Sequence, residues 1–156
     1  MQVRRYEKGE ERTLRQLFFQ SIRNVCIRDY TSEHIEAWAA ENFDLDSWRR
    51  RIEEINPFVA VVDGMIVGYA DVQTDGYIDH FYTHFEWQGK GVGTALMRTI
   101  VECAESHTVA RLYSDVSVTA RPFFEARGFH VLKEQFVSIA GQSLKNYRMD
   151  RSLERI

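Results

Sequence analysis

Three glycines at alternate positions, Gly89, Gly91 and Gly93, stand between a predicted strand and a predicted amphipathic helix. Residues without a Cβ atom let the backbone approach a ligand closely and adopt positive φ angles. The N–H groups of the first helical turn then point at the ligand, and the helix dipole favours an anion there. Gln88 and Lys90 add an amide and a positive charge. The loop at residues 88–94 is therefore predicted to bind phosphate groups.

Two familiar phosphate-binding motifs do not account for this loop. A Walker A motif would place glycine at position 84 and serine or threonine at position 91, where the chain has His84 and Gly91. A Rossmann motif beginning at Gly89 would need glycine in place of Thr94, and further βα units after it. The chain continues instead into strands that favour antiparallel pairing.

The elements around the loop follow from the hydrophobic periods and the turn residues. Upstream we expect a strand at 3–6, a helix at 10–26, a helix beginning at Thr31 or Ser32, a helix capped by Asp46 that ends before Pro57, and strands at 58–62, 65–72 and 77–83. The pairs Asp63-Gly64 and Asp75-Gly76 are typical of tight turns, so these three strands should be antiparallel neighbours. Downstream we expect a helix to about His107, a strand at 111–116, a helix at 120–127, and strands at 129–137 and 144–150. This order predicts one α/β domain over residues 1–156, with a mixed sheet and a parallel crossover at the loop.

The composition limits the classes of protein. The chain has 156 residues, 44% hydrophobic and 28% charged, with a net charge of -3, which indicates a folded globular protein and argues against a nucleic-acid partner. No window is apolar enough to span a membrane and Met1–Tyr6 carries no secretory signal, so a cytoplasmic location is expected. Cys26 and Cys103 form no CxxC motif, and His80 with His84 lacks a third ligand, so no metal site is expected.

Two motifs in the expected order resemble the GNAT superfamily of N-acetyltransferases. Gln88, Gly91 and Gly93 match its Gln/Arg-x-x-Gly-x-Gly/Ala signature, and Ala120–Phe129 (ARPFFEARGF) is similar to its later A-x-x-F-Y-E-x-x-G-F stretch. Through Tyr77-Ile78-Asp79 and residues 35–39, the chain looks closest to the YafP-like branch. The resemblance implies a three-layer acyl-CoA N-acyltransferase fold that transfers an acetyl group from acetyl-CoA to a primary amine of a small molecule by direct attack.

The resemblance also implies where acetyl-CoA, as acyl donor, would bind. Its pyrophosphate should lie on the loop, and its pantetheine arm should run beside the preceding strand, with polar help from the end of the next strand. The residues implied are Phe81, Tyr82, Thr83, Gln88, Gly89, Lys90, Gly91, Val92, Gly93, Thr94, Ser117, Thr119, Phe123 and Phe124. Position 124 is commonly a tyrosine that protonates the leaving thiolate, so Phe124 leaves the general acid unassigned.

The strand at 77–83 carries the candidate catalytic groups. Strict alternation would place Tyr77, Asp79 and Phe81 on one face and Ile78, His80 and Tyr82 on the other. Tyr77 stands at the position where some members of the family that the chain resembles have a glutamate as general base, but a neutral tyrosine cannot serve in that role. Asp79 is therefore the preferred general base, acting through a water, and His80 is the second choice. A purely structural capping role for Asp79 is an equal alternative. A backbone N–H around Tyr82 is the expected oxyanion donor.

The acceptor amine is expected between the first helices and the last hairpin, at Arg28, Tyr30, Trp38 and Tyr77. A closed pocket there would favour a small molecule, whereas an open groove would favour a protein lysine or N-terminus. A non-catalytic acyl-CoA-binding module is the remaining alternative, and Phe124 supports it. The oligomeric state is left open, and a homodimer is one option.

Overall fold

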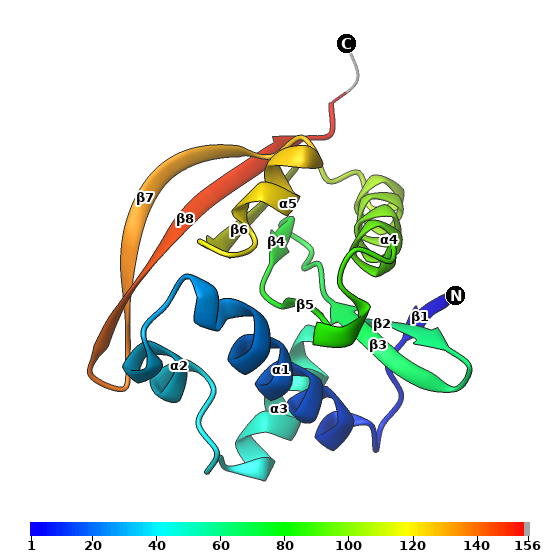
Figure 1. Cartoon of the computed structure of the whole chain (residues 1–156). Helices are drawn as coiled ribbons and strands as arrows, with labels where there is room; N and C mark the ends of the chain where they lie inside the picture. Colours follow the sequence, from blue (N-terminus) through cyan, green and yellow to red (C-terminus); the bar gives the residue numbers. More distant parts are fainter. Residues whose placement is uncertain (155–156) are drawn as a thin grey trace.

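The computed structural model describes residues 1–154 and divides the strands between two four-stranded sheets (Figure 1). Sheet A has the order β1-β2-β3-β5, with β1 at Gln2–Arg5, β2 at Phe58–Val62, β3 at Met65–Ala70 and β5 at Phe81–Thr83. Sheet B has the order β4-β6-β8-β7, with β4 at Tyr77–Ile78, β6 at Arg111–Ser117, β7 at His130–Ile139 and β8 at Gln142–Ser152. All pairs are antiparallel except β4 with β6, which is parallel. The mixed α/β architecture predicted from the sequence is confirmed.

Helices cover both sides of these sheets. On one side lie α1 (Glu11–Val25), the short 3₁₀ helix η1 (Cys26–Arg28), α2 (Ser32–Trp38) and α3 (Leu45–Ile55); on the other lie α4 (Val92–Ser106) and α5 (Arg121–Ala126), with the 3₁₀ helix η2 (Phe85–Trp87) before the loop. Among residues 1–154, no helix combines the length and the apolar character that a membrane crossing requires.

The helix caps agree with the sequence in one case and differ in another. Thr31 caps α2 as predicted, because its Oγ1 accepts the backbone N–H of His34 at 3.1 Å. The expected cap at Asp46 is wrong: Asp44 caps α3, and its Oδ1 accepts the N–H groups of Asp46 and Ser47. Asp46 therefore lies in the first turn, where its charge favours the helix dipole.

The predicted strand at 77–83 is interrupted at Asp79 and His80, between β4 and β5. Ile78 packs in the core cluster beneath α4 and α5, whereas the His80 ring stacks on Phe18 of α1. The expectation that Ile78 and His80 share a face is therefore wrong, because an irregularity at this point breaks the two-residue alternation. The break sends β4 into sheet B and β5 into sheet A.

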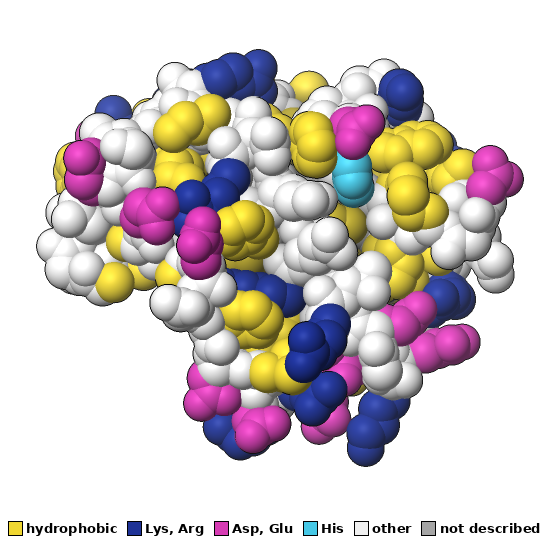
Figure 2. Space-filling model, turned by 60° about the horizontal axis from the view of Figure 1, so that its bottom comes forward, with side chains coloured by type: hydrophobic (Ala, Val, Ile, Leu, Met, Phe, Trp, Pro, Cys, Tyr) yellow, Lys and Arg dark blue, Asp and Glu magenta, His cyan; other side chains and the backbone are white. Residues whose placement is uncertain are grey.

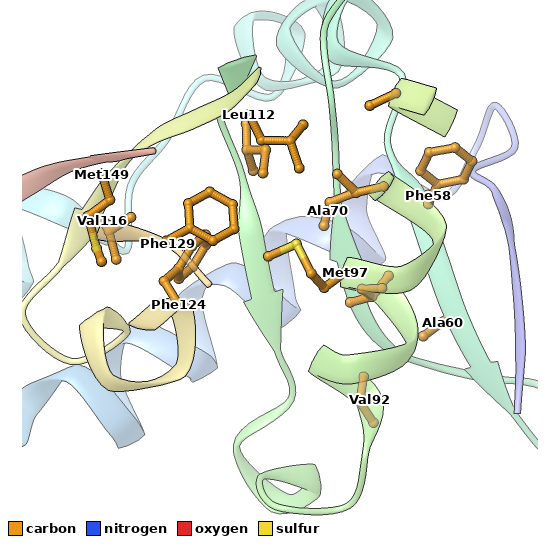
Figure 3. Packing of buried hydrophobic residues seen from close by; sticks show 14 of the residues in the cluster. Phe58, Ala60, Ala70, Val92, Met97, Leu112, Val116, Phe124, Phe129 and Met149 are labelled. Carbon is orange, nitrogen blue, oxygen red and sulfur yellow. The ribbon is translucent and has the colours of Figure 1, made fainter. Parts of the chain in front are cut away.

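Two hydrophobic clusters fill the space between the layers. One lies between α4, α5 and the inner faces of both sheets, and Figure 3 shows Met97 of α4 near Ala70 of sheet A. The second joins α1, α2 and α3 to the opposite face of sheet A and to Leu144 of β8. The break between β4 and β5 thus lies where the two sheets and both clusters meet.

Candidate active site

A cleft opens between β5 and β6, because β4 pairs with β6 while β5 pairs with β3. Its volume is about 270 Å³, and it runs from the loop at 88–94 to the break after β4. Thirteen of the predicted cofactor residues line it: Phe81, Tyr82, Thr83, Gln88, Gly89, Gly91, Val92, Gly93, Thr94, Ser117, Thr119, Phe123 and Phe124. Lys90 is the exception, and its Nζ lies 5.1 Å from the centre of the Trp87 ring.

The glycine loop forms one end of the cleft. Gly91 is the N-cap of α4 with φ of +84°, and Gly89 has φ of +72°. A Cβ atom on Gly91 would meet open space, whereas one on Gly93 would lie 2.9 Å from the Phe123 ring. Glycine at position 91 therefore allows the positive φ of the N-cap and leaves room for a ligand to approach the backbone. Glycine at position 93 allows α4 and α5 to pack closely.

Arg127 is a functional candidate at this end that sequence reasoning missed. Its guanidinium donates a hydrogen bond to Thr94 Oγ1 at 2.5 Å and lies 4.4 Å from the Phe123 ring centre. Both contacts hold a positive charge beside the first turn of α4, and Arg127 lines the cleft. Its place between Ala126 and Gly128 in the second motif was the available signal.

The register of β5 decides which of its amides face the cleft. Asp71 N–H donates to His80 O and His84 N–H donates to Val67 O, so these two pairs are hydrogen-bonded across β3 and β5. Hydrogen-bonded pairs alternate along an antiparallel ladder, so the Tyr69–Tyr82 pair between them directs the Tyr82 N–H toward β3. The Phe81 N–H points the other way, toward the cleft. The oxyanion donor is expected around Tyr82, and of these two amides the one that faces the cleft is that of Phe81.

Asp79 lines the far end of the cleft and forms an ion pair with Arg51 of α3. Its side chain is 18% exposed. Arg51 also approaches Glu54, and Arg49 approaches Glu11, so two of the three successive arginines at positions 49–51 of α3 are ion-paired. Figure 2 shows acidic and basic side chains interspersed over this side of the molecule.

Asp115 of β6 is a second carboxylate at this end, and sequence reasoning missed it. It accepts hydrogen bonds from Arg148 Nε at 2.6 Å and from Gln135 Nε2 at 2.7 Å, and one from the Tyr77 hydroxyl at 3.3 Å. Burial and the negative charge of Asp115 raise the pKa of Tyr77 to about 12. No local spacing in the sequence links these residues, because β4, β6, β7 and β8 each contribute one.

The structure does not bring His80 into the cleft lining. Its Nδ1 lies 3.0 Å from the Tyr69 hydroxyl, and its ring packs against Phe18 and Trp48. Desolvation by this burial lowers the pKa of His80 to about 3, so the imidazole is neutral at pH 7 and a weak base. The geometry therefore favours Asp79 over His80 as the base.

The four expected acceptor residues are placed differently from one another. Arg28 and Trp38 line the cleft, whereas Tyr30 and Tyr77 do not. The Tyr30 hydroxyl donates to Lys145 O at 2.5 Å and accepts the Val118 N–H at 2.9 Å, and burial raises its pKa to about 12. Tyr30 is thus committed to backbone contacts that hold the segment after η1 against sheet B.

Phe124 and Cys26 bear on proton transfer in the cleft. Phe124 is 3% exposed and packs against Phe81 and Phe129, so an apolar ring occupies the position of the family's tyrosine. Burial raises the pKa of the Cys26 thiol to about 11, so it is protonated at neutral pH. Within residues 1–154, His, Cys, Asp and Glu form no group of three or more that could hold a metal ion.

Comparison with known proteins places this cleft in a family. The sequence model of the Acetyltransferase (GNAT) domain matches residues 26–150. The chain is 29% identical over 149 residues to the uncharacterized N-acetyltransferase YafP of Escherichia coli K12, covering 96% of this chain and 94% of that protein. A GCN5-related N-acetyltransferase structure from Rhodopseudomonas palustris is 30% identical, with a TM-score of 0.93 and coverage of 97% of this chain and 95% of that one.

A more distant structure shares the fold. The phosphinothricin acetyltransferase of Sinorhizobium meliloti, solved in complex with acetyl-CoA, is 18% identical, with a TM-score of 0.74 over 97% of this chain and 88% of that one. The match to the family model over most of the chain confirms the resemblance carried by the two motifs. The chain belongs to the GNAT family of N-acetyltransferases.

Proposed function

We propose that this protein transfers the acetyl group of acetyl-CoA to a primary amine of a small molecule by direct attack. The observation that carries the proposal is a single cleft with the glycine loop at one end and the carboxylate of Asp79, paired with Arg51, at the other. Between them, β5 offers the unpaired N–H of Phe81 to an extended ligand. The complexes of relatives with CoA or acetyl-CoA support the same donor here.

The residues along the cleft are suited to the successive parts of the donor. The loop amides and Arg127 would hold the diphosphate, and Gly91 leaves the open space that a phosphate needs. The pantetheine arm would run along β5, where the edge facing β6 has no strand partner. The thioester would then lie near Phe81 and Asp79, because these residues line the end opposite the loop.

The chemistry requires a deprotonated amine and a stabilised oxyanion. An alkylamine of pKa ~10.4 is about 3.4 units above pH 7, which corresponds to about 4.6 kcal/mol. Asp79, through a water, would take the proton as the amine nitrogen bonds to the thioester carbon. The Phe81 N–H would stabilise the oxyanion, after which the C–S bond breaks. A thiol of pKa ~8.5 leaves as a thiolate and takes its proton from solvent, so the apolar ring of Phe124 is compatible with turnover.

The acceptor side favours a small amine over a protein segment. Trp38 and Val25 from the helical layer line the same cleft as Asp115 of β6. The bonds of the Tyr30 hydroxyl to Lys145 O and Val118 N–H fix this layer against sheet B. An amine must therefore enter between walls that are tied together, which suits a compact molecule better than a polypeptide chain.

The test mixes the protein with acetyl-CoA and a panel of amines and follows free thiol and acetylated product. We expect thiol release that depends on a small primary amine. Asp79→Asn should lower kcat by about 10²-fold or more, while the matched variant Asp63→Asn, in an exposed turn, should not change it. Release only with peptides would identify a protein acetyltransferase, and CoA binding without any release would identify a binding module.

A further inference from the structure

Asp71, directly after β3, is a fully buried carboxyl group that the proposed mechanism does not use. Its Oδ1 accepts two successive backbone N–H groups, from Asp79 at 3.0 Å and from His80 at 2.6 Å. Its Oδ2 accepts Gln73 Nε2 at 2.7 Å. Its own N–H donates to His80 O at 3.1 Å. Asp71 therefore contacts the chain at the point where the strand breaks.

Two successive amides that converge on one oxygen cannot belong to a regular strand. In a strand, neighbouring N–H groups point to opposite edges, so one acceptor on one edge receives only one of them. The carboxylate replaces the ladder partner of both amides and satisfies groups that would otherwise be buried without hydrogen bonds. Asp71 thereby stabilises the break that separates β4 from β5.

The same network reaches α3 by two routes. Gln73 Nε2 donates to Ile55 O at 3.1 Å, at the last residue of α3, as well as to Asp71. One helical turn earlier, Arg51 forms the ion pair with the Asp79 side chain. The backbone of Asp79 is thus held from the strand side and its carboxylate from the helix side.

We propose that Asp71 is a positioning residue for acetyl transfer: by binding the amides of Asp79 and His80, it directs the Asp79 carboxylate and the Phe81 N–H at the reacting thioester. This inference rests on the proposed function. Asp71 itself touches neither substrate, since Asp79 and Phe81 line the cleft and Asp71 does not. Its loss should therefore reduce the rate of the chemical step more than the affinity for the donor.

The experiment compares Asp71→Leu with Asp71→Asn in the full-length protein. Leucine has a similar shape but no acceptor, whereas asparagine keeps an oxygen for the two amides. We expect Asp71→Leu to lower kcat by about 10²-fold, as misplacement of reacting groups does, with the Kd for CoA within about threefold of wild type. We expect Asp71→Asn to retain kcat within about tenfold.

Glu11→Leu is the matched control for the loss of a buried carboxylate. Glu11 is 3% exposed and accepts the Gly9 N–H at the first turn of α1, more than two helical turns from Ser21, the nearest residue of α1 that lines the cleft. The variant Glu11→Leu should have a lower free energy of unfolding than wild type and the same kcat. The positioning role would be overturned if Asp71→Leu and Asp71→Asn had the same kcat, or if Glu11→Leu lost as much kcat as Asp71→Leu. A wild-type protein that binds CoA but is inactive would overturn the proposed function alone.

Amide hydrogen exchange tests the inference in the wild type, should Asp71→Leu fail to fold. Asp79 and His80 lie outside the regular ladders, so protection of both amides requires the Asp71 carboxylate. We expect both to exchange as slowly as the amides of β3, and to remain protected in Asp71→Asn. Exchange of either amide as fast as that of Gly64, in the exposed turn, would contradict the inference.

Discussion

Asp71 also links the stability of the protein to pH. Desolvation raises the pKa of its carboxyl group from 3.8 to about 6, against the opposing effect of its hydrogen bonds. The folded state therefore binds a proton between pH 4 and 6 that the unfolded state has released. A raised folded pKa contributes stability that is present below pH 3.8 and is lost as the pH rises through 6.

The measurement compares the free energy of unfolding of wild type with that of Asp71→Asn. The contributions of the other carboxylates to the pH dependence are the same in both proteins and cancel in the difference. From pH 4 to pH 7 the free energy of unfolding of wild type should fall by about 2 kcal/mol relative to that of Asp71→Asn. Denaturant titrations at four pH values would measure it. A difference that does not vary with pH would show that Asp71 has an ordinary pKa.

At the scale of elements, the proposed function treats the loop and the first turn of α4 as one phosphate-binding unit. Gly91→Glu adds a carboxylate at the N-cap of α4, where a Cβ atom meets open space in the lining of the cleft. We expect it to abolish CoA binding by blocking and repelling the diphosphate, at a conformational cost of about 1–2 kcal/mol for the positive φ. Calorimetry with CoA and thermal unfolding would measure the two effects.

Gly64→Glu provides the control for that substitution. Gly64 has φ of +78° and also faces open space, but it lies in the turn between β2 and β3. It should lose similar stability and keep the affinity for CoA. If Gly91→Glu bound CoA as wild type does, the diphosphate would lie elsewhere.

Elements whose cause is local were predictable from the sequence, and those with a distant cause were not. The turn at Asp63-Gly64 is confirmed, because both residues adopt the positive φ that their types tolerate, +49° and +78°. The break at Asp79 was not predictable, because the side chain that accepts its amide belongs to an aspartate eight residues earlier. Nothing in a strand pattern shows which carboxylate will accept two amides.

The same distinction holds for the two ends of the cleft. The loop end was predictable because the glycine spacing and the helix start are visible in the sequence, and backbone recognition of phosphate uses this pattern. The other end carries Asp115 with its partners Arg148 and Gln135, which come from three strands and meet only after the sheet forms. Tyr30 was expected in the acceptor site from its place between the first helices and the last hairpin, and its hydroxyl instead joins two backbone segments.

At the scale of the whole molecule, the cleft exists because the two sheets and the helical layer are held in a fixed relation. Tyr30 contributes directly, since its hydroxyl ties the segment after η1 to β8 at Lys145 and to the loop after β6 at Val118. Removing the hydroxyl leaves the partly buried Lys145 carbonyl and Val118 N–H without this hydrogen-bond partner. Such a loss costs about 1–3 kcal/mol.

Tyr30→Phe should therefore lower the stability by about 2 kcal/mol and the Tm by about 4–8 °C. Tyr113→Phe is the matched control, because that hydroxyl donates to Asp75 at an exposed position, and it should change the Tm by less than about 2 °C. CoA at about 100 times the Kd of each variant should add about 2.7 kcal/mol to the stability of both variants through mass action. An unchanged Tm in Tyr30→Phe would show that the helical layer is held against sheet B by apolar packing alone. The width of the cleft would then be set by the break at Asp79 and not by the hydrogen bonds of the Tyr30 hydroxyl.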